Sequence, residues 1–167
     1  MEQKIKYLII GAVVTTTFTF LLYGLTNPPI VDYTLHCSSS FDPRYSTRLT
    51  VVLEVRNRGH IDAPLLLVLT VQNATIFPID KPWAECTDSR IKLYVIAMKN
   101  SEQYSAYAVD IVVDSSYESF TLTYSIEKRF DPSISGVISL LFAEFHGFYP
   151  TSVTYVKDAE GRYNSQE

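Results

Sequence analysis

The sequence predicts an all-β fold, an antiparallel β-sandwich of two packed sheets, preceded by one N-terminal transmembrane helix. Two observations lead to this prediction. Residues 7–25 carry no charged side chain, which is typical of a segment that spans a bilayer. After residue 27 the apolar residues recur with a period of two rather than 3.6, which indicates strands with one buried face.

The apolar segment, YLIIGAVVTTTFTFLLYGL, has the length of a membrane span. A helix rises about 1.5 Å per residue, so residues 7–26 match a hydrocarbon core about 30 Å thick. Asn27-Pro28-Pro29 ends the helix, since proline cannot continue it. The threonines of the segment can hydrogen-bond to carbonyl groups one turn earlier, which makes them tolerable in lipid; these are Thr15, Thr16, Thr17 and Thr19.

A cleaved signal peptide is the alternative interpretation of this segment. Signal peptides have a shorter apolar core and end in small residues, whereas residues 20–26 read FLLYGLT. An uncleaved anchor is therefore expected. Lys4 and Lys6 precede the segment and the first charge after it is Asp32, so the positive-inside rule keeps the N-terminus in the cytoplasm.

These observations divide the chain into four parts of a single-pass cell-membrane protein whose C-terminal domain lies outside. They are a cytoplasmic N-terminus (1–6), a transmembrane anchor (7–26), an extracytoplasmic β-sandwich (27–160) and a C-terminal tail (161–167).

The exported part contains about eight predicted strands. In residues 119–127, apolar Phe120, Leu122, Tyr124 and Ile126 alternate with polar residues, as in a half-buried antiparallel strand. Residues 63–71 and 137–145 are apolar on both faces, so they are expected to be central, covered strands. In chain order the predicted strands are 30–36, 48–57, 63–71, 91–98, 107–113, 119–127, 137–145 and 151–157.

Turn residues separate these segments, and one short pattern occurs twice. Phe41-Asp42-Pro43 and Phe130-Asp131-Pro132 each precede a predicted strand. Matched ligand loops or a duplicated half-domain would produce such a repeat. Turn chemistry also explains it, because Asp and Pro favour the first two positions of a β-turn and a Phe can fill the end of a sandwich. We favour the turn interpretation.

Residues 51–76 contain two apolar runs around a polar hinge, Asn57-Arg58-Gly59-His60-Ile61-Asp62. The residues of this pattern are Val51, Val55, Asn57, Gly59, Ala63, Leu67, Leu69 and Val71. It resembles the strand–turn–strand core of CARDB-type, immunoglobulin-like extracellular domains. The resemblance implies a surface-exposed sandwich of the kind used in adhesion and cell-envelope proteins, and it implies no catalytic residues.

The chain departs from a true immunoglobulin domain, because Trp83 lies just before Cys86 rather than after the first cysteine. The hinge is expected to be a turn in which Asn and Gly accept positive φ. Ala63 then allows the following strand to pack closely.

Composition and motifs exclude several functions. The net charge is −4 and no basic face is visible, so nucleic acid is not expected as a partner. The sequence has no phosphate-binding glycine loop, no GxSxG and no EF-hand pattern, so no cofactor and no catalytic residue are predicted. Three histidines have a Cys, Asp or Glu close in sequence: His36 with Cys37, His60 with Asp62, and His146 with Glu144. Two side chains do not make a metal site, and no third ligand is visible, so metal ligands are not predicted either.

The expected function is that of a non-catalytic, membrane-anchored interaction module, such as an adhesion domain, a scaffold or a subunit of an envelope complex. Its partner would be a protein or a surface glycan. One alternative is a carbohydrate-binding module, because the 12 tyrosines include several near predicted strand ends that could stack on sugars: Tyr104, Tyr117, Tyr149, Tyr155 and Tyr163. An enzyme or a metal-dependent protein is the second alternative.

Two covalent features are predicted for the exported part. Cys37 and Cys86 are expected to form a disulfide, since oxidation is permitted outside the cytoplasm and the cysteine count is even. Two separate buried thiols are the competing possibility. Asn73-Ala74-Thr75 is an N-glycosylation sequon in a predicted loop.

Overall fold

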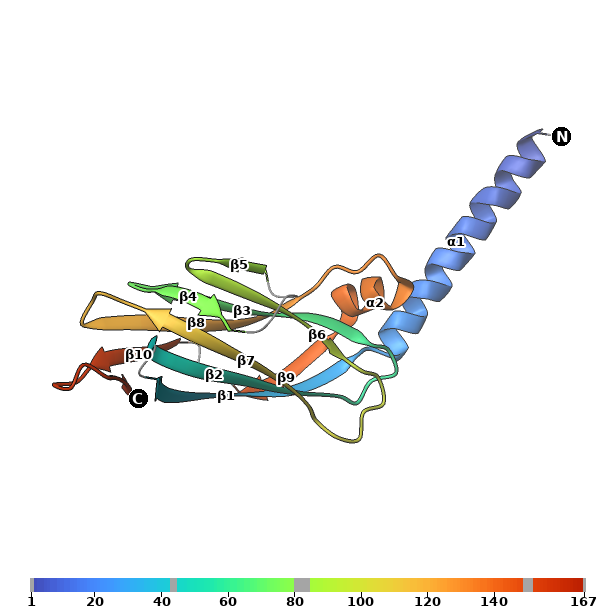
Figure 1. Cartoon of the computed structure of the whole chain (residues 1–167). Helices are drawn as coiled ribbons and strands as arrows, with labels where there is room; N and C mark the ends of the chain where they lie inside the picture. Colours follow the sequence, from blue (N-terminus) through green and yellow to red (C-terminus); the bar gives the residue numbers. More distant parts are fainter. Residues whose placement is uncertain (1, 43–44, 80–84, 149–151, 167) are drawn as a thin grey trace.

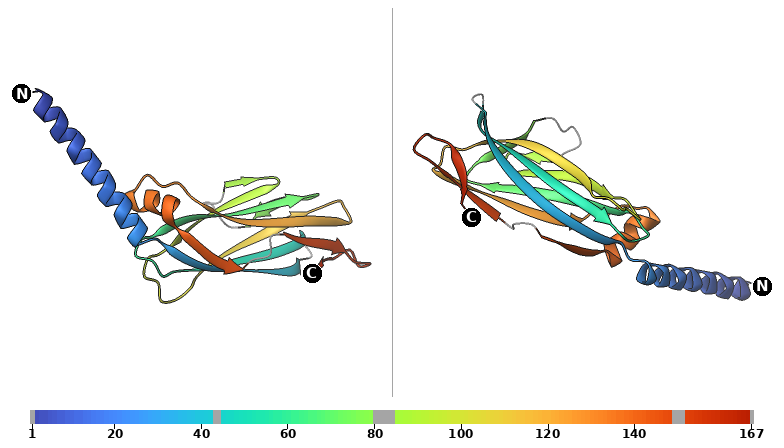
Figure 2. Two further views of the ribbon diagram at one scale, coloured as in Figure 1. Left: turned by 180° about the vertical axis from the view of Figure 1, so that it is seen from behind. Right: turned by 90° about the horizontal axis from the view of Figure 1, so that it is seen from below.

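The computed structural model describes residues 2–42, 45–79, 85–148 and 152–166. It consists of a long N-terminal helix, α1 (Glu2–Thr26), that projects from one end of a two-layered β-sandwich (Figure 1). The C-terminus lies toward the opposite end (Figure 2). The predicted fold class, a β-sandwich preceded by an apolar helix, is confirmed.

One sheet has five strands in the order β4-β7-β2-β1-β9. Their bounds are β4 (Thr75–Pro78), β7 (Ser105–Asp114), β2 (Tyr45–Asn57), β1 (Ile30–Asp42) and β9 (Glu144–Phe148). Neighbouring strands are antiparallel except β1 and β9, which run parallel with Ile30 opposite Glu144. The prediction of antiparallel sheets therefore has one exception, the parallel β1–β9 pair.

The second sheet has six strands in the order β11-β10-β8-β3-β6-β5, all antiparallel. Their bounds are β11 (Tyr163–Gln166), β10 (Ser152–Lys157), β8 (Ser119–Lys128), β3 (Ala63–Gln72), β6 (Arg90–Ala97) and β5 (Glu85–Thr87). The predicted tail, residues 161–167, thus contains an edge strand. Tyr163 of that strand is buried and its ring lies edge-on to Phe120, with 4.9 Å between centroids.

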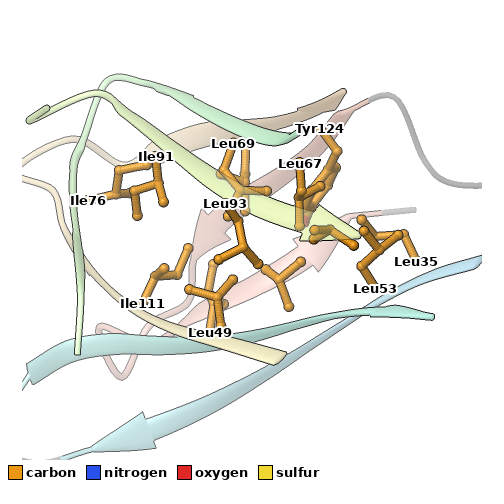
Figure 3. Packing of buried hydrophobic residues seen from close by; sticks show 14 of the residues in the cluster. Leu35, Leu49, Leu53, Leu67, Leu69, Ile76, Ile91, Leu93, Ile111 and Tyr124 are labelled. Carbon is orange, nitrogen blue, oxygen red and sulfur yellow. The ribbon is translucent and has the colours of Figure 1, made fainter. Parts of the chain in front are cut away.

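The core lies between the sheets and follows the predicted period of two (Figure 3). Leu49, Val51 and Leu53 are completely buried, whereas Thr50 and Val52, which alternate with them, are only partly buried. Burying each such side chain contributes about 1.5–3 kcal/mol, so the alternation itself specifies which face of each strand turns inward.

The prediction of a strand at 137–145 is wrong, because most of it forms a short helix, α2 (Ile134–Phe142). The Ser133 hydroxyl caps this helix by accepting a hydrogen bond from the Gly136 amide at 3.1 Å. An apolar run alone does not distinguish a buried strand from a helix. Because α2 carries the chain from β8 in one sheet to β9 in the other, β9 can run parallel to β1.

The repeated Phe-Asp-Pro pattern has no shared structural role in the described residues. Asp131 accepts a hydrogen bond from the Ser133 amide at 2.8 Å, which is turn chemistry as expected. Phe130, however, is 65% exposed and does not fill the end of the sandwich. Pro43 and Arg44 of the other copy lie outside the described residues.

The hinge after β2 is organised by the buried amide of Asn57. Its oxygen accepts hydrogen bonds from the backbone amides of Ile30 (3.2 Å) and Gly59 (2.9 Å). Its nitrogen donates to the carbonyl oxygens of Ile61 (2.8 Å) and Ala97 (3.0 Å). All four hydrogen-bonding positions of the side chain are therefore used, and one residue joins β1, the hinge and β6.

The predicted reason for Asn57 and Gly59 is wrong, because neither residue has positive φ; the described residues that do are Asn73, Asn100 and Gly161. Gly59 is required by space instead. A Cβ atom at this position would lie 2.5 Å from the Pro28 carbonyl oxygen and 2.6 Å from the Pro29 Cα. The hinge therefore packs tightly against residues 28–30, which follow α1.

Replacing Asn57 with Ala is expected to lower the free energy of unfolding by about 3 kcal/mol or more. The substitution leaves two amides and two carbonyls of the backbone without partners in a buried place. Denaturant unfolding of the full chain in detergent, followed by near-ultraviolet circular dichroism, measures the change. Asn164→Ala is the control, since that exposed amide bonds only to the Asp158 carboxylate among the described contacts. Equal stabilities of the two variants would contradict the role assigned to Asn57.

Candidate functional site at the junction of helix and sandwich

The last turn of α1 packs against α2 through Gly24, the buried residue of the helix. A Cβ atom at Gly24 would lie 2.5 Å from ring atoms of Phe142 and 3.4 Å from the Ile138 Cγ2 atom. The absence of a side chain therefore allows the two helices to approach closely. Figure 1 shows α2 beside the base of α1.

The rest of α1 stands free of the sandwich. Its most apolar window has a mean hydropathy of 2.0 and is 6% buried, so the helix is long and apolar enough to cross a membrane or to act as a signal sequence. The predicted back-bonding of the threonines is confirmed. The Thr15 hydroxyl donates to the Gly11 carbonyl oxygen at 2.9 Å. The hydroxyls of Thr16, Thr17 and Thr19 likewise each donate to the carbonyl oxygen four residues earlier.

A surface groove of about 420 Å³ lies where α1, the hinge and α2 meet. Its polar wall includes His60 and Asp62 of the hinge and Lys99 of the β6–β7 connection, and its apolar wall includes Ile134 and Ile138 of α2. Tyr23 of α1 closes one side. The Asp62 carboxylate accepts a hydrogen bond from the Lys99 amide at 2.7 Å. The hinge is therefore a turn that also lines a groove beside the apolar helix.

The outer face of α2 is apolar and exposed. Ile134 is 72% exposed and Leu141 is 55% exposed; seven residues apart, they lie on the same side of the helix. Gly136 and Ser139, on the other side of the helix, are buried, and Ile138 is buried along the edge of the exposed face, where Gly24 packs on it. No residue of α2 carries a charge. The sequence analysis missed this face, although Ser133, a favoured helix N-cap residue just before the apolar run, was a signal for the helix.

A second groove, of about 520 Å³, lies at the pole of the sandwich farthest from α1. It is lined by the β3–β4 turn, with Asn73, and by the β7–β8 turn, with Asp114 to Tyr117. Asn73 is exposed and has φ 62°. The Ser115 hydroxyl donates to the Asn73 carbonyl oxygen at 2.6 Å. The glycosylation sequon therefore lies on an accessible turn at this pole.

The loop tyrosines among the described residues do not form a sugar-stacking row. Tyr155 and Tyr163 are buried against Phe120 in the core. Tyr104 and Tyr117 are exposed, but they flank opposite ends of β7, a strand about 33 Å long at about 3.3 Å per residue. Tyr149 lies outside the described residues.

The three histidine pairs also have plain structural environments. His36 is exposed while Cys37 packs against the core, so the two side chains lie on opposite faces of β1. His146 Nε2 lies 3.6 Å from a Glu144 carboxylate oxygen, and both side chains are more than half exposed. Within the described residues, no group of three His, Cys, Asp or Glu side chains could hold a metal ion.

The predicted Cys37–Cys86 disulfide is not present, since both residues are free thiols. The Cys37 sulfur lies 3.2 Å from the Tyr155 hydroxyl of β10, whereas Cys86 belongs to β5. Four strand spacings separate β10 from β5 in the sheet, about 19 Å, which is too far for a bridge. Residues 80–84, which precede β5, lie outside the described residues.

Comparison with known proteins gives little guidance. No protein-family model and no curated protein matches the chain. Among solved structures, the chain is similar to a collagen-binding domain from a Staphylococcus aureus adhesin, with 9% sequence identity and a TM-score of 0.30. The match covers 61% of this chain and 91% of that domain. A likeness at this level identifies no functional residue.

Alkylation without reductant is expected to add two groups to the unfolded chain, because both cysteines are thiols. In the folded chain Cys86 should react first, since Cys37 is half-buried. Burial, with the nearby Asp88 carboxylate, raises the pKa of the Cys86 thiol, so its thiolate fraction at neutral pH is below that of a free cysteine peptide. Mass spectrometry over a pH series, with such a peptide as reference, should place the Cys86 midpoint at higher pH. An unfolded chain that takes up no alkyl group would contradict the free thiols and support the predicted Cys37–Cys86 disulfide.

Proposed function

We propose that the chain is a membrane-anchored, extracytoplasmic and non-catalytic interaction module. The observation that carries this proposal is the packing of Gly24 against Phe142 and Ile138. The last turn of α1 is part of the folded domain, so cleavage of the helix as a signal peptide would uncover the apolar side chains that it covers. An uncleaved anchor is the arrangement in which this contact persists. Lys4 and Lys6, at the N-terminal end of α1, favour an outward-facing sandwich.

A protein partner is favoured over a glycan by the outer surface of the six-stranded sheet. Ile96 is 47% exposed and Met98, two residues on, is 56% exposed, so both side chains point away from the core. The Tyr107 hydroxyl, on β7 of the other sheet, donates to the Ile96 carbonyl oxygen at 2.7 Å and so links the two sheets beside these side chains. Adjacent exposed apolar side chains of this kind are typical of protein contacts. An adhesion domain, a scaffold and a subunit of an envelope complex all use such a surface.

The anchor and its orientation predict a protected N-terminus and an accessible sandwich. The intact mass of the chain purified from membranes should include α1. Protease added to intact cells should digest the sandwich while sparing the N-terminal end of α1. A mass that begins near residue 27 would contradict the anchor, and digestion only after lysis would contradict the orientation.

The protein-partner proposal predicts that the chain leaves native membranes in a complex. In gel filtration of a mild detergent extract, the tagged chain should elute ahead of a micelle holding one copy. The double variant Ile96→Lys, Met98→Lys should shift it to the position of the single copy, because charges on this surface oppose an apolar contact. Phe77→Lys on β4, where the side chain is 46% exposed, is the matched control. A parent chain that elutes as a monomer would count against the proposal.

A further inference from the structure

We infer that α2 lies in the headgroup region of the outer leaflet, with its apolar face of Ile134, Val137 and Leu141 against the lipid, and thereby fixes how the sandwich stands on the membrane. The inference rests on the proposed function, in which α1 is an uncleaved span. It assigns a membrane contact to an element outside the span itself.

The depth of α2 follows from its contact with α1. At about 1.5 Å per residue, Gly24 lies about 26 Å along the helix from Tyr7, the first residue after the charged Lys6. A hydrocarbon core is about 30 Å thick. If the apolar segment fills that core, Gly24 is at its outer boundary. Phe142 and Ile138 pack on Gly24, so α2 is held at the same boundary.

The surface of α2 suits that depth. An interfacial helix buries an apolar face at the level where headgroups meet acyl chains. Ile134 and Leu141 are exposed in the isolated chain, and Val137, half-buried between them, is on the same side of the helix. In water these apolar side chains would remain exposed to solvent, whereas lipid would cover them.

Groups around α2 complete this arrangement. Tyr23, half-exposed in the same groove as Ile134, is a residue type enriched at membrane interfaces. Lys99 borders the groove, and the Lys128 ammonium donates to the Leu140 carbonyl oxygen at 3.3 Å, so a cation stands near each end of the helix where lipid phosphates would lie. Two carboxylates also lie near α2: Asp62 accepts a hydrogen bond from the Lys99 amide, and Asp131 accepts one from the Ser133 amide.

Quenching by brominated lipid tests the inference in the full chain. Trp83 is the single tryptophan, so Trp83→Phe gives a silent background into which Leu141→Trp is introduced. The protein is reconstituted into phosphatidylcholine vesicles with bromine near the top of the acyl chains, and flotation verifies membrane association. Tyr117→Trp, at the far pole and 58% exposed, is the matched control.

The expected result is a blue-shifted emission from the tryptophan at position 141 that is lost in brominated vesicles, with unchanged, water-like emission from position 117. A floating protein whose position-141 emission stays water-like overturns the inference and leaves the anchor intact. Blue-shifted emission that bromine does not quench also overturns it, because a second copy or another protein then covers α2. A chain that fails to float overturns both the anchor and the inference.

Ile134→Asp combined with Leu141→Asp supplies a second readout. Both side chains are exposed, so the sandwich should fold as before. In a Cys37→Ser background, a dye on the exposed Cys86 reports energy transfer to acceptor lipids. The double variant should change the transfer efficiency, since α2 no longer holds the domain against the bilayer. Phe77→Asp should not change it. Unchanged transfer in the double variant would overturn the inference.

Discussion

The amide of Asn57 is the interaction on which the rest of the structure depends. It joins the start of β1, the hinge, and the end of β6 with four hydrogen bonds. The two sheets meet at this point, because β1 belongs to one sheet and β6 to the other. A buried amide with every donor and acceptor used specifies one arrangement of these segments, whereas apolar packing alone would tolerate several.

The same corner transmits the position of α1 to the sandwich. Arg58 donates its backbone amide to the Ile30 carbonyl oxygen at 2.9 Å, and Glu144 donates to that of Pro29 at 2.9 Å. With Gly24 against α2, the helix is connected to the domain on several sides within one turn of its end. Such a junction is a rigid connection rather than a flexible linker. A membrane contact by α2 would therefore orient the whole sandwich.

The sequence predicts the periodic parts of this molecule and misses the parts that depend on distant contacts. Strict alternation in 119–127 defined β8, since burial of one face follows directly from period two. Residues 137–145 were misassigned because an apolar run has no period to distinguish helix from strand. The pattern around Gly59 predicts a positive φ, but the residue is required by the close approach of Pro28 and Pro29. That approach is a tertiary contact, which local sequence does not reveal. The groove beside His60 and Asp62, and the apolar face of α2, both arise from elements brought together by the fold.

The parallel pairing of β1 with β9 has a consequence for biogenesis. β1 is the first strand to follow α1, yet its outer neighbour is built from residues 144–148. Contacts between such distant parts of a chain form slowly, because the intervening loop must be closed first. The sheet edge beside β1 is thus completed only after residues 144–148 have been synthesised. Until then β1 has one unpaired edge, to which other chains or chaperones can bind.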